Sequence, residues 1–511
     1  MLVDKSGPSD GTIDTAPPLA GANRALALML IINLFNYIDR QVLSAVLPRL
    51  QMDGTLFAAD DTNVQLKLGA LTSAFLAAYM LFSPLVGWLD GHGYRRWIIL
   101  GVGVSLWSLA SGGSGFATTY WILFLTRCFV GVGEGAYVPV SSAMIADIYP
   151  PRQRSTVIAL YNMAIPVGSA IGFLIGGQVS DYFDDWRHAF WFTFLGLFLG
   201  VLCFLKKEFP RPRVITANTV THSYFDVLRL LTRNKSFVMC CAGMTAITFV
   251  IGGVAAWVPA YVFQREARFV MTAKTLESLE NPPADVKRHP VPAATITKLQ
   301  LKVDGEERDL VAFKKHISPA IDEKESALYL ESIIVVSTTE SSPKLGTIST
   351  IFGGIVVIGG LVATGVGAWL GEVLKPRLNG AYFVVIGVGA LLAFPCYLGL
   401  LYAPFPLAWL FVFLSVFGLF MHVGPGNTIL ANVVTSDVRA TAFAINILVI
   451  HALGDVISPP LIGAVADVSS LQTAFLLMSV MIILGGVLWI AGARFLEADT
   501  RRAIEAEKRN G

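Results

Sequence analysis

Twelve apolar runs, each long enough to cross a bilayer as a helix, constrain this 511-residue chain more than any other feature. A helix needs about 20 residues to span the hydrocarbon core. The runs lie near residues 25–48, 67–90, 95–112, 119–145, 155–180, 187–205, 236–263, 345–374, 379–400, 405–434, 438–467 and 471–495. Backbone N–H and C=O groups in lipid must be paired within the protein, and helices pair them locally. The chain is therefore predicted to be an all-α polytopic membrane protein.

Composition supports this prediction and excludes other classes. Hydrophobic residues make up 54% of the chain and charged residues 14%, whereas about 25% charged is usual in soluble domains. A net charge of +2 without a basic face predicts no nucleic-acid partner. The five cysteines all lie in apolar runs without the spacing of metal ligands, so we expect small core residues, with no metal site and no cofactor.

Lysine and arginine gather on one side of the predicted spans. They lie in the turns that begin near residues 95, 152, 206, 377 and 439 and in the C-terminal tail, whereas the turn at 112–120 has none. Basic residues favour the cytoplasmic side of short loops. We therefore expect an integral protein of the cell (inner) membrane, surrounded by membrane lipids, with both termini in the cytoplasm.

An internal repeat divides the chain into two halves. Residues 154–159 (RSTVIA) recur as 439–444 (RATAFA), and each segment runs into an apolar helix that ends at an aspartate, Asp181 or Asp467. Spans five and eleven are then counterparts, which predicts two pseudo-symmetric six-helix bundles of the kind that transporters use. The alternative is two unrelated helices that share a loop composition.

These observations predict the domain limits. They are a cytoplasmic tail at 1–24, an N-terminal bundle at 25–205, a linker at 206–235, a C-terminal bundle at 236–495 and a second tail at 496–511. An extracytoplasmic insert at 265–344 interrupts the second bundle. Alternating residues at 294–303, the Asp304-Gly305 turn and a second run at 332–337 favour a small β structure, and a partly disordered loop is the alternative.

Ionisable residues inside the spans are the candidate site. Span one carries Asn36, Tyr37, Asp39 and Arg40; span four carries Arg127 and Glu134; span eleven carries His451 and Asp455. A charge near the bilayer centre costs roughly 2.5 to 3.5 kcal/mol on insertion scales, so such residues usually serve a function and have a partner.

Helix geometry suggests which of these groups meet. Asp39 and Arg40 are adjacent and point about 100° apart, so one can face a central cavity while the other reaches a neighbouring helix. Arg127 and Glu134 are seven residues apart on one helix face, and we expect them to share partners. Arg40 is predicted to pair with Glu134, and protonation of the carboxylate would break and remake the pair. The alternative is a permanent salt bridge that only holds the two spans together.

The turn between spans two and three resembles the loop signature of the major facilitator superfamily. It reads GWLDGHGYRR at 87–96. Arg95 and Arg96 fit the pattern, and they also fit ordinary basic anchors at the membrane surface. Asp90 comes one residue earlier than in the family, and such a shift turns a helical side chain by about 100°. The gating ion pair that this loop makes in relatives is therefore in question here.

Three segments together resemble the spinster branch of that superfamily. They are NYIDR at 36–40, RCFVGVGEGA at 127–136 and HALGDVISP at 451–459. The resemblance covers essentially all spans and implies the major facilitator fold, alternating access and a lysolipid or sphingolipid substrate. It further implies substrate-binding and proton-coupling roles for Asp39, Arg40, Arg127 and Glu134. His451, Asp455 and Ser458 match the span-eleven segment, where hydrogen bonding between helices is the competing interpretation.

The expected function is thus a proton-coupled secondary transporter, acting as a monomer, for an amphipathic anionic lipid. A carrier of a small organic anion or drug is the alternative, because cavity arginines bind carboxylates as well as phosphates. An enzyme is not expected, since the intramembrane polar groups form neither a nucleophile with its base nor a metal cluster. The chain also lacks a nucleotide-binding Walker loop.

Overall fold

The computed structural model describes residues 17–510 except 54, 58–60, 211–223, 281–290, 309, 322–332, 334–335 and 340–341. Within these residues, twelve helices are long and apolar enough to cross a membrane. They coincide with the twelve predicted runs, so the all-α polytopic fold is confirmed. The predicted tail at 1–24 and the linker at 206–235 fall partly outside the described residues.

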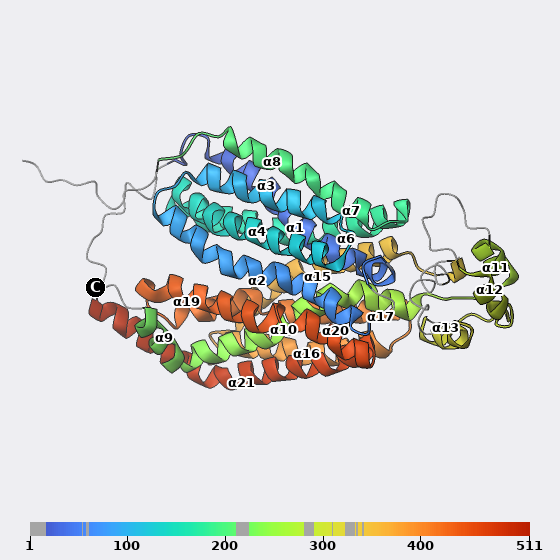
Figure 1. The fold of residues 1–511 in the computed structure, drawn as a ribbon. Helices are drawn as coiled ribbons and strands as arrows, with labels where there is room; N and C mark the ends of the chain where they lie inside the picture. Colours follow the sequence, from blue (N-terminus) through green and yellow to red (C-terminus); the bar gives the residue numbers. More distant parts are fainter. Residues whose placement is uncertain are drawn as a thin grey trace, which may run out of the picture.

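The first six spans form one half of the molecule, drawn uppermost in Figure 1. They are α1 (Ala22–Met52), α2 (Val64–Gly91), α3 (Arg96–Ser114), α4 (Tyr120–Ile148), α5 and α6 together (Pro151–Asn162 and Ala164–Phe183), and α7, η2 and α8 together (Arg187–Trp191, Phe192–Phe194 and Leu195–Phe204).

The other six spans form the second half, drawn below the first. They are α10 (Lys235–Glu266), α15 (Leu345–Leu374), α16 (Ala381–Tyr402), α17 and α18 (Leu407–Phe420 and Val423–Asn432), α19 with a π-helix and α20 (Ser436–Ile450, His451–Asp455 and Ser458–Val468), and α21 (Leu471–Asn510). The short helix α9 (Tyr224–Arg233) precedes α10.

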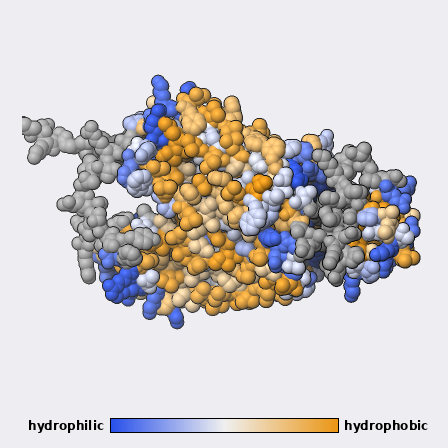
Figure 2. All heavy atoms as spheres, viewed as in Figure 1, coloured by the Kyte–Doolittle hydropathy of each residue, from blue (hydrophilic) through white to orange (hydrophobic). Residues whose placement is uncertain are grey.

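The two ends of the bundle differ. The start of α1 and the end of α21 lie on the left in Figure 1, which we call the terminal face, and the insert projects on the right, which we call the insert face. Between them a hydrophobic belt covers the visible surface, with hydrophilic residues gathered towards the two ends (Figure 2). Such a belt matches the apolar core of a bilayer.

Glycines let the helices of the first half pack closely. Gly168, Gly172 and Gly176 repeat every four residues on one side of α6, against α1. A Cβ atom on Gly172 would lie 2.4 Å from the backbone oxygen of Ile38, so any larger residue would push the helices apart. Close backbone approach of this kind is a main source of helix association in membranes.

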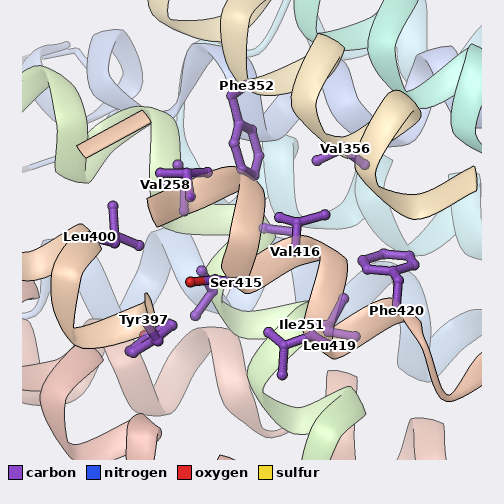
Figure 3. Close-up of a pocket in the computed structure, with 13 residues that line it drawn as sticks. Ile251, Val258, Phe352, Val356, Tyr397, Leu400, Ser415, Val416, Leu419 and Phe420 are labelled. Atoms are coloured by element: carbon purple, nitrogen blue, oxygen red, sulfur yellow. The ribbon is translucent and has the colours of Figure 1, made fainter. Parts of the chain in front are cut away.

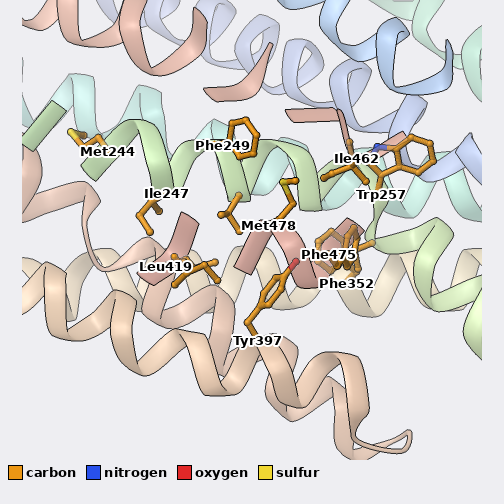
Figure 4. Packing of buried hydrophobic residues seen from close by; sticks show 14 of the residues in the cluster. Met244, Ile247, Phe249, Trp257, Phe352, Tyr397, Leu419, Ile462, Phe475 and Met478 are labelled. Atoms are coloured by element: carbon orange, nitrogen blue, oxygen red, sulfur yellow. The ribbon is translucent and has the colours of Figure 1, made fainter. Parts of the chain in front are cut away.

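Large apolar side chains fill the second half. Trp257 of α10, Tyr397 of α16 and Phe475 of α21 are each at most 1% exposed, and they lie in one cluster with Ile462 and Leu419 (Figure 4). The cluster joins α10 to the helices around it, so this half has a dense apolar interior.

The hydrogen bonds that join the halves lie at the insert face and at mid-depth. Gln264 donates to Gln51 at 2.9 Å and Gln178 donates to Thr350 at 3.3 Å near the insert, and Ser73 donates to the Val456 oxygen deeper in the bundle. The described state is thus closed at the insert face.

The insert folds as a small helical unit with its own apolar core. It contains α11 (Ala273–Glu280), α12 (Ala293–Gln300) and α13 (Leu310–Ile317), packed around buried residues such as Phe269, Phe313 and Leu299. The predicted strand at 294–303 is wrong, because the apolar residues that alternate there also fit a short helix that buries Ile296 and Leu299 on one side. The second predicted strand, 332–337, lies partly outside the described residues.

The predicted turn in the insert is present. Gly305 adopts a φ of +70° and the Asp304 carboxylate accepts the Glu306 N–H at 3.1 Å. Arg308 donates to both oxygens of Asp304, at 3.0 and 2.6 Å. These hydrogen bonds lower the pKa of Asp304 to about 2. The carboxylate therefore stabilises the turn above its unfolded pKa, and this contribution is lost only as the pH falls towards 2.

The C-terminal tail is not separate from the last span. The helix α21 runs without a break from Leu471 to Asn510, so it continues into residues 496–511, which we expected to form a cytoplasmic tail. The Asp499 carboxylate in this last part of α21 accepts the Ser236 N–H at the start of α10 at 2.9 Å. The helix beyond the membrane is thus attached to the second half.

Candidate functional site

Arg40 and Glu134 form an ion pair in the interior of the first half. The Nε and Nη2 atoms of Arg40 lie 2.7 and 2.6 Å from the same oxygen, Oε2, of Glu134. The Glu134 side chain is fully buried, whereas 19% of the Arg40 side chain is exposed. The predicted pairing of spans one and four is therefore present, with the cation on the accessible side.

Three aromatic rings surround the same guanidinium. Its carbon lies 4.8 Å from the ring centre of Tyr37, 4.9 Å from that of Phe75 and 5.6 Å from that of Tyr79. Tyr37 stands three residues before Arg40 on α1, and Phe75 and Tyr79 stand four apart on α2, so each helix presents its rings on one face. Cation–π contacts of about 0.5 to 2 kcal/mol each hold the charge in place.

Asp39 points to a different helix from Arg40, as the angle between adjacent residues predicts. It accepts a hydrogen bond from Ser111 of α3, and only 2% of the residue is exposed. Arg127 of α4 donates to the same Ser111 at 3.3 Å and to Ser114 at 2.6 Å. Asp39 and Arg127 are thus linked through one serine, deep between α1, α3 and α4.

Arg127 and Glu134 make hydrogen bonds to different residues, although both lie within electrostatic range of Asp39. Arg127 donates to serines of α3 and lies over the ring of Phe190 at 5.0 Å, whereas Glu134 contacts Arg40. Seven residues return a helix to the same face but also advance it by about 10 Å along its axis. The two groups therefore lie at different depths, and Arg127 is the one nearer the insert face.

Several polar atoms around the ion pair are buried, and their only further contact within the described residues is a weak one between Asn36 and the Glu134 carboxylate. They are both amide atoms of Asn36, Oδ2 of Asp39 and Oε1 of Glu134. Buried polar atoms are normally paired. Their concentration next to Arg40 therefore marks a place where a polar ligand group can form hydrogen bonds. It is also a place where a carboxylate can take up a proton.

The second half contributes a histidine and an aspartate on an irregular helical segment. His451 Nδ1 lies 2.7 Å from Asp455 Oδ2, and both belong to the π-helix His451–Asp455. π-Helical turns often occur at functional sites. Asp455 packs against Gly252 of α10 and lies within electrostatic range of Arg40 in the first half. Ser458, fully buried, starts α20 beside Gly253.

The loop between α2 and α3 forms an ion-pair network at the terminal face. Arg96 binds both oxygens of Asp90, at 2.7 and 3.1 Å, and a carboxylate oxygen of Asp147 at 2.6 Å. Asp90 thus pairs with arginine despite its shifted position in the sequence. Arg95 is exposed and precedes the first residue of α3. Arg96, Asp90 and Asp147 all belong to the first half, and the network connects the α2–α3 loop to the end of α4.

Sequence reasoning missed several of these contacts. Nothing in the sequence distinguished Phe75 and Tyr79 from lipid-facing aromatics, although their spacing of four places them on one helix face. Ser111 and Ser114, three apart in an apolar run, are the sequence signal for the partners of Asp39 and Arg127 on α3. Among the described residues, no group of three or more His, Cys, Asp or Glu side chains is placed to hold a metal ion.

Comparison with known families and sequences gives a consistent result. The family model described as Major Facilitator Superfamily matches residues 29–276. Human protein spinster homolog 1 is 30% identical over 506 residues, covering 94% of this chain and 82% of the relative. Zebrafish protein spinster homolog 3 is 29% identical, covering 94% of this chain and 86% of the relative.

Comparison with solved structures supports the same fold. A bacterial homolog to the human lysosomal transporter Spinster, in an inward-facing and unoccupied conformation, matches with a TM-score of 0.67 at 17% identity, covering 94% of this chain and 99% of the other. A D-xylose-proton symporter matches with a TM-score of 0.60 at 14% identity, covering 91% and 96%. At these identities the likeness concerns the fold alone.

Proposed function

Because this chain belongs to the spinster family of the major facilitator superfamily, we propose that it is a secondary transporter that carries an amphipathic anionic lipid together with protons. The family and the fold make it a transporter that works by alternating access, not an enzyme. A lysolipid or a sphingolipid-like molecule has the required chemistry. Its anionic headgroup would bind Arg40, and its chain would lie among apolar residues.

The observation that carries this proposal is the difference between the two halves. The first half offers a partly exposed guanidinium in an aromatic setting. The second half contains an apolar cavity of about 60 Å³ between α10, α15, α16 and α17 (Figure 3). Of the thirteen residues that line it, only Tyr397 and Ser415 have polar side chains. A cavity of this size can hold the end of an apolar chain, which supports a ligand with one anionic end and one apolar end.

The alternative substrate, a small organic anion or drug, would use the same cation without the cavity. Uptake into proteoliposomes separates the two. We expect a lysolipid to be transported and a short-chain anion with the same headgroup to be transported poorly, because each buried methylene contributes about 0.8 kcal/mol. Equal transport of both compounds would favour the small-anion carrier.

Filling the cavity tests the apolar part of the site. Val416→Phe is expected to raise the apparent KM for a long-chain lysolipid about tenfold, equivalent to roughly two methylenes kept out of the pocket, and to leave a short-chain analogue unaffected. Val362→Phe is a matched control, because Val362 is 49% exposed on the outer surface of α15. An unchanged KM for the long-chain compound would remove the cavity from the site.

We place the termini in the cytoplasm and the protein in the cell (inner) membrane, from the basic residues beside the spans. The described state, closed at the insert face, is then inward-facing, which agrees with the state of the bacterial homolog. We further propose that one chain is the working unit, since both halves of the site come from the same chain.

Cysteine labelling tests this orientation. Arg501 is exposed at the terminal face and Leu301 is 86% exposed in the insert. In sealed right-side-out vesicles, a membrane-impermeant maleimide should label Leu301→Cys at once and Arg501→Cys only after permeabilisation. Labelling of both positions before permeabilisation, or the reverse order, would overturn the orientation.

A further inference from the structure

The two aspartates that end the repeated helices both reach across to the opposite half. Asp181, near the end of α6, accepts the N–H of Gly346 at the start of α15 with Oδ2 at 2.6 Å. Asp467, near the end of α20, accepts the N–H groups of Gln65 and Leu66 at the start of α2, at 2.9 and 2.8 Å. The same residue type, at matching places in the repeat, thus binds the first turn of a helix in the other half.

A carboxylate at the start of a helix is a favourable contact. The first N–H groups of a helix have no partner within it, and the helix dipole places partial positive charge there. Hydrogen bonds from such groups to an ionised carboxylate are stronger than neutral ones. Each aspartate therefore stabilises the contact between the halves at the insert face.

Glycines beside the aspartates bring the two halves into backbone contact. A Cβ atom on Gly463 of α20 would lie 2.1 Å from the Gln65 oxygen, and one on Gly177 of α6 would lie 2.8 Å from the Cα atom of Gly346. The amides can be reached only while the helices are this close. Separation of the halves at the insert face must therefore break the hydrogen bonds of both aspartates.

The two contacts differ in what holds the aspartate itself. Arg49 of α1, in the same half as Asp181, binds Oδ1 of Asp181 at 3.0 Å and Asp184 at 2.6 Å. Asp181 therefore keeps a cationic partner when the halves separate. Both hydrogen bonds of Asp467, in contrast, cross to the other half, so its release breaks two such bonds, whereas release of Asp181 breaks one.

We propose that Asp181 and Asp467 are paired latches that hold the insert face closed and must release α15 and α2 whenever that face opens. The latches follow from the repeat and from the contacts between the halves. They require only alternating access, so they stand whether the substrate is a lipid or a small anion and whether or not protons are coupled.

Distances between spin labels test the latches without substrate and without a pH gradient. One label pair, Tyr182→Cys and Val468→Cys, spans the insert face at positions that are 81% and 86% exposed. A second pair, Leu205→Cys and Leu228→Cys, spans the terminal face. The five native cysteines are replaced first.

Asp181→Asn with Asp467→Asn is expected to raise the ratio of open to closed insert face about tenfold, the size typical of charged contacts at helix starts, with a shorter distance at the terminal face. Asp467→Asn alone should shift the ratio more than Asp181→Asn alone. Asp185→Asn is the matched control, because Asp185 accepts the Arg187 N–H within its own half at 2.9 Å. An unchanged ratio in the double variant, or an equal shift in the control, would overturn the proposal.

A second measurement, made in intact membranes, tests the latches in variants that are not stable enough to purify. Gln178 and Thr350 face each other across the insert face, so cysteines at both positions should cross-link in intact membranes. In the double aspartate variant the rate of cross-linking should fall in proportion to the closed population, by at most about tenfold. A rate equal to that of the parent protein would also refute the latches.

Discussion

Replacing Arg40 with alanine is expected to abolish transport while the protein still inserts and folds. The guanidinium is the partly exposed cation of the ion pair, and a fixed charge near mid-membrane needs an anion in every state of the cycle. Glu134 supplies that anion when the substrate is absent, and the substrate headgroup competes for it when the substrate is bound. Without Arg40 the headgroup loses its charged partner.

Arg40→Lys should restore little of the activity. Lysine keeps the charge but loses the planar fork that holds phosphate or carboxylate at two points, and it stacks less well on Tyr37, Phe75 and Tyr79. We expect transport efficiency to fall by about 10- to 100-fold, the range for loss of a charged hydrogen bond.

Proteoliposome uptake measures both variants. Arg233→Ala serves as the control, because Arg233 is exposed at the end of α9. Full activity of Arg40→Ala would make the span-one charge structural. Wild-type efficiency in Arg40→Lys would mean that only a generic positive charge is needed.

The sequence predicted the parts of this site that depend on charge in an apolar setting. Arg40 and Glu134 could be paired because each is too costly in lipid to stand alone. The different directions of Asp39 and Arg40 followed from helix geometry. The twelve spans followed from hydropathy, since each run had to be covered by lipid or by other helices.

The rest depends on contacts between helices that are distant in sequence. The rings of Phe75 and Tyr79 become a cage only because α2 packs beside α1 at the depth of Arg40. The partners of Arg127 are set by the residues of neighbouring helices that lie at the same depth in the membrane. Residue spacing gives relative depth only within one helix, so it could not identify those partners. In the insert, residues 294–303 fit strand and helix equally over so short a length, and packing decided for the helix.

The repeat was visible in the sequence, but the consequence of its final aspartates was not. From the sequence alone, Asp181 and Asp467 indicate only the polar ends of two spans, because helices commonly end in a polar residue at the membrane surface. Their acceptor role depends on where α15 and α2 begin in the opposite half. Symmetry in the sequence therefore becomes a symmetric contact only after the halves are assembled.

Replacing Glu134 with glutamine is expected to remove the dependence of transport on a proton gradient while leaving folding and ligand binding largely intact. Glutamine has the shape of the protonated carboxyl group but cannot release a proton. In the parent protein Oε2 of Glu134 contacts Arg40, and the Asn36 amide lies beside the same carboxylate. A proton on this carboxylate weakens its hold on Arg40 and frees the guanidinium for the substrate.

Substrate and proton are linked through the Arg40 guanidinium. The variants Arg40→Ala and Glu134→Gln are therefore expected to give different results. Arg40→Ala should lose substrate binding as well as transport, whereas Glu134→Gln should bind substrate with nearly parental affinity and show the same uptake with and without an imposed pH gradient. Glu497→Gln, at an exposed surface pair, should keep the parental response to the gradient. If Glu134→Gln is still driven normally by a proton gradient, the coupling group lies elsewhere, and Asp39, buried next to Arg127 and Ser111, is then the next carboxylate to replace.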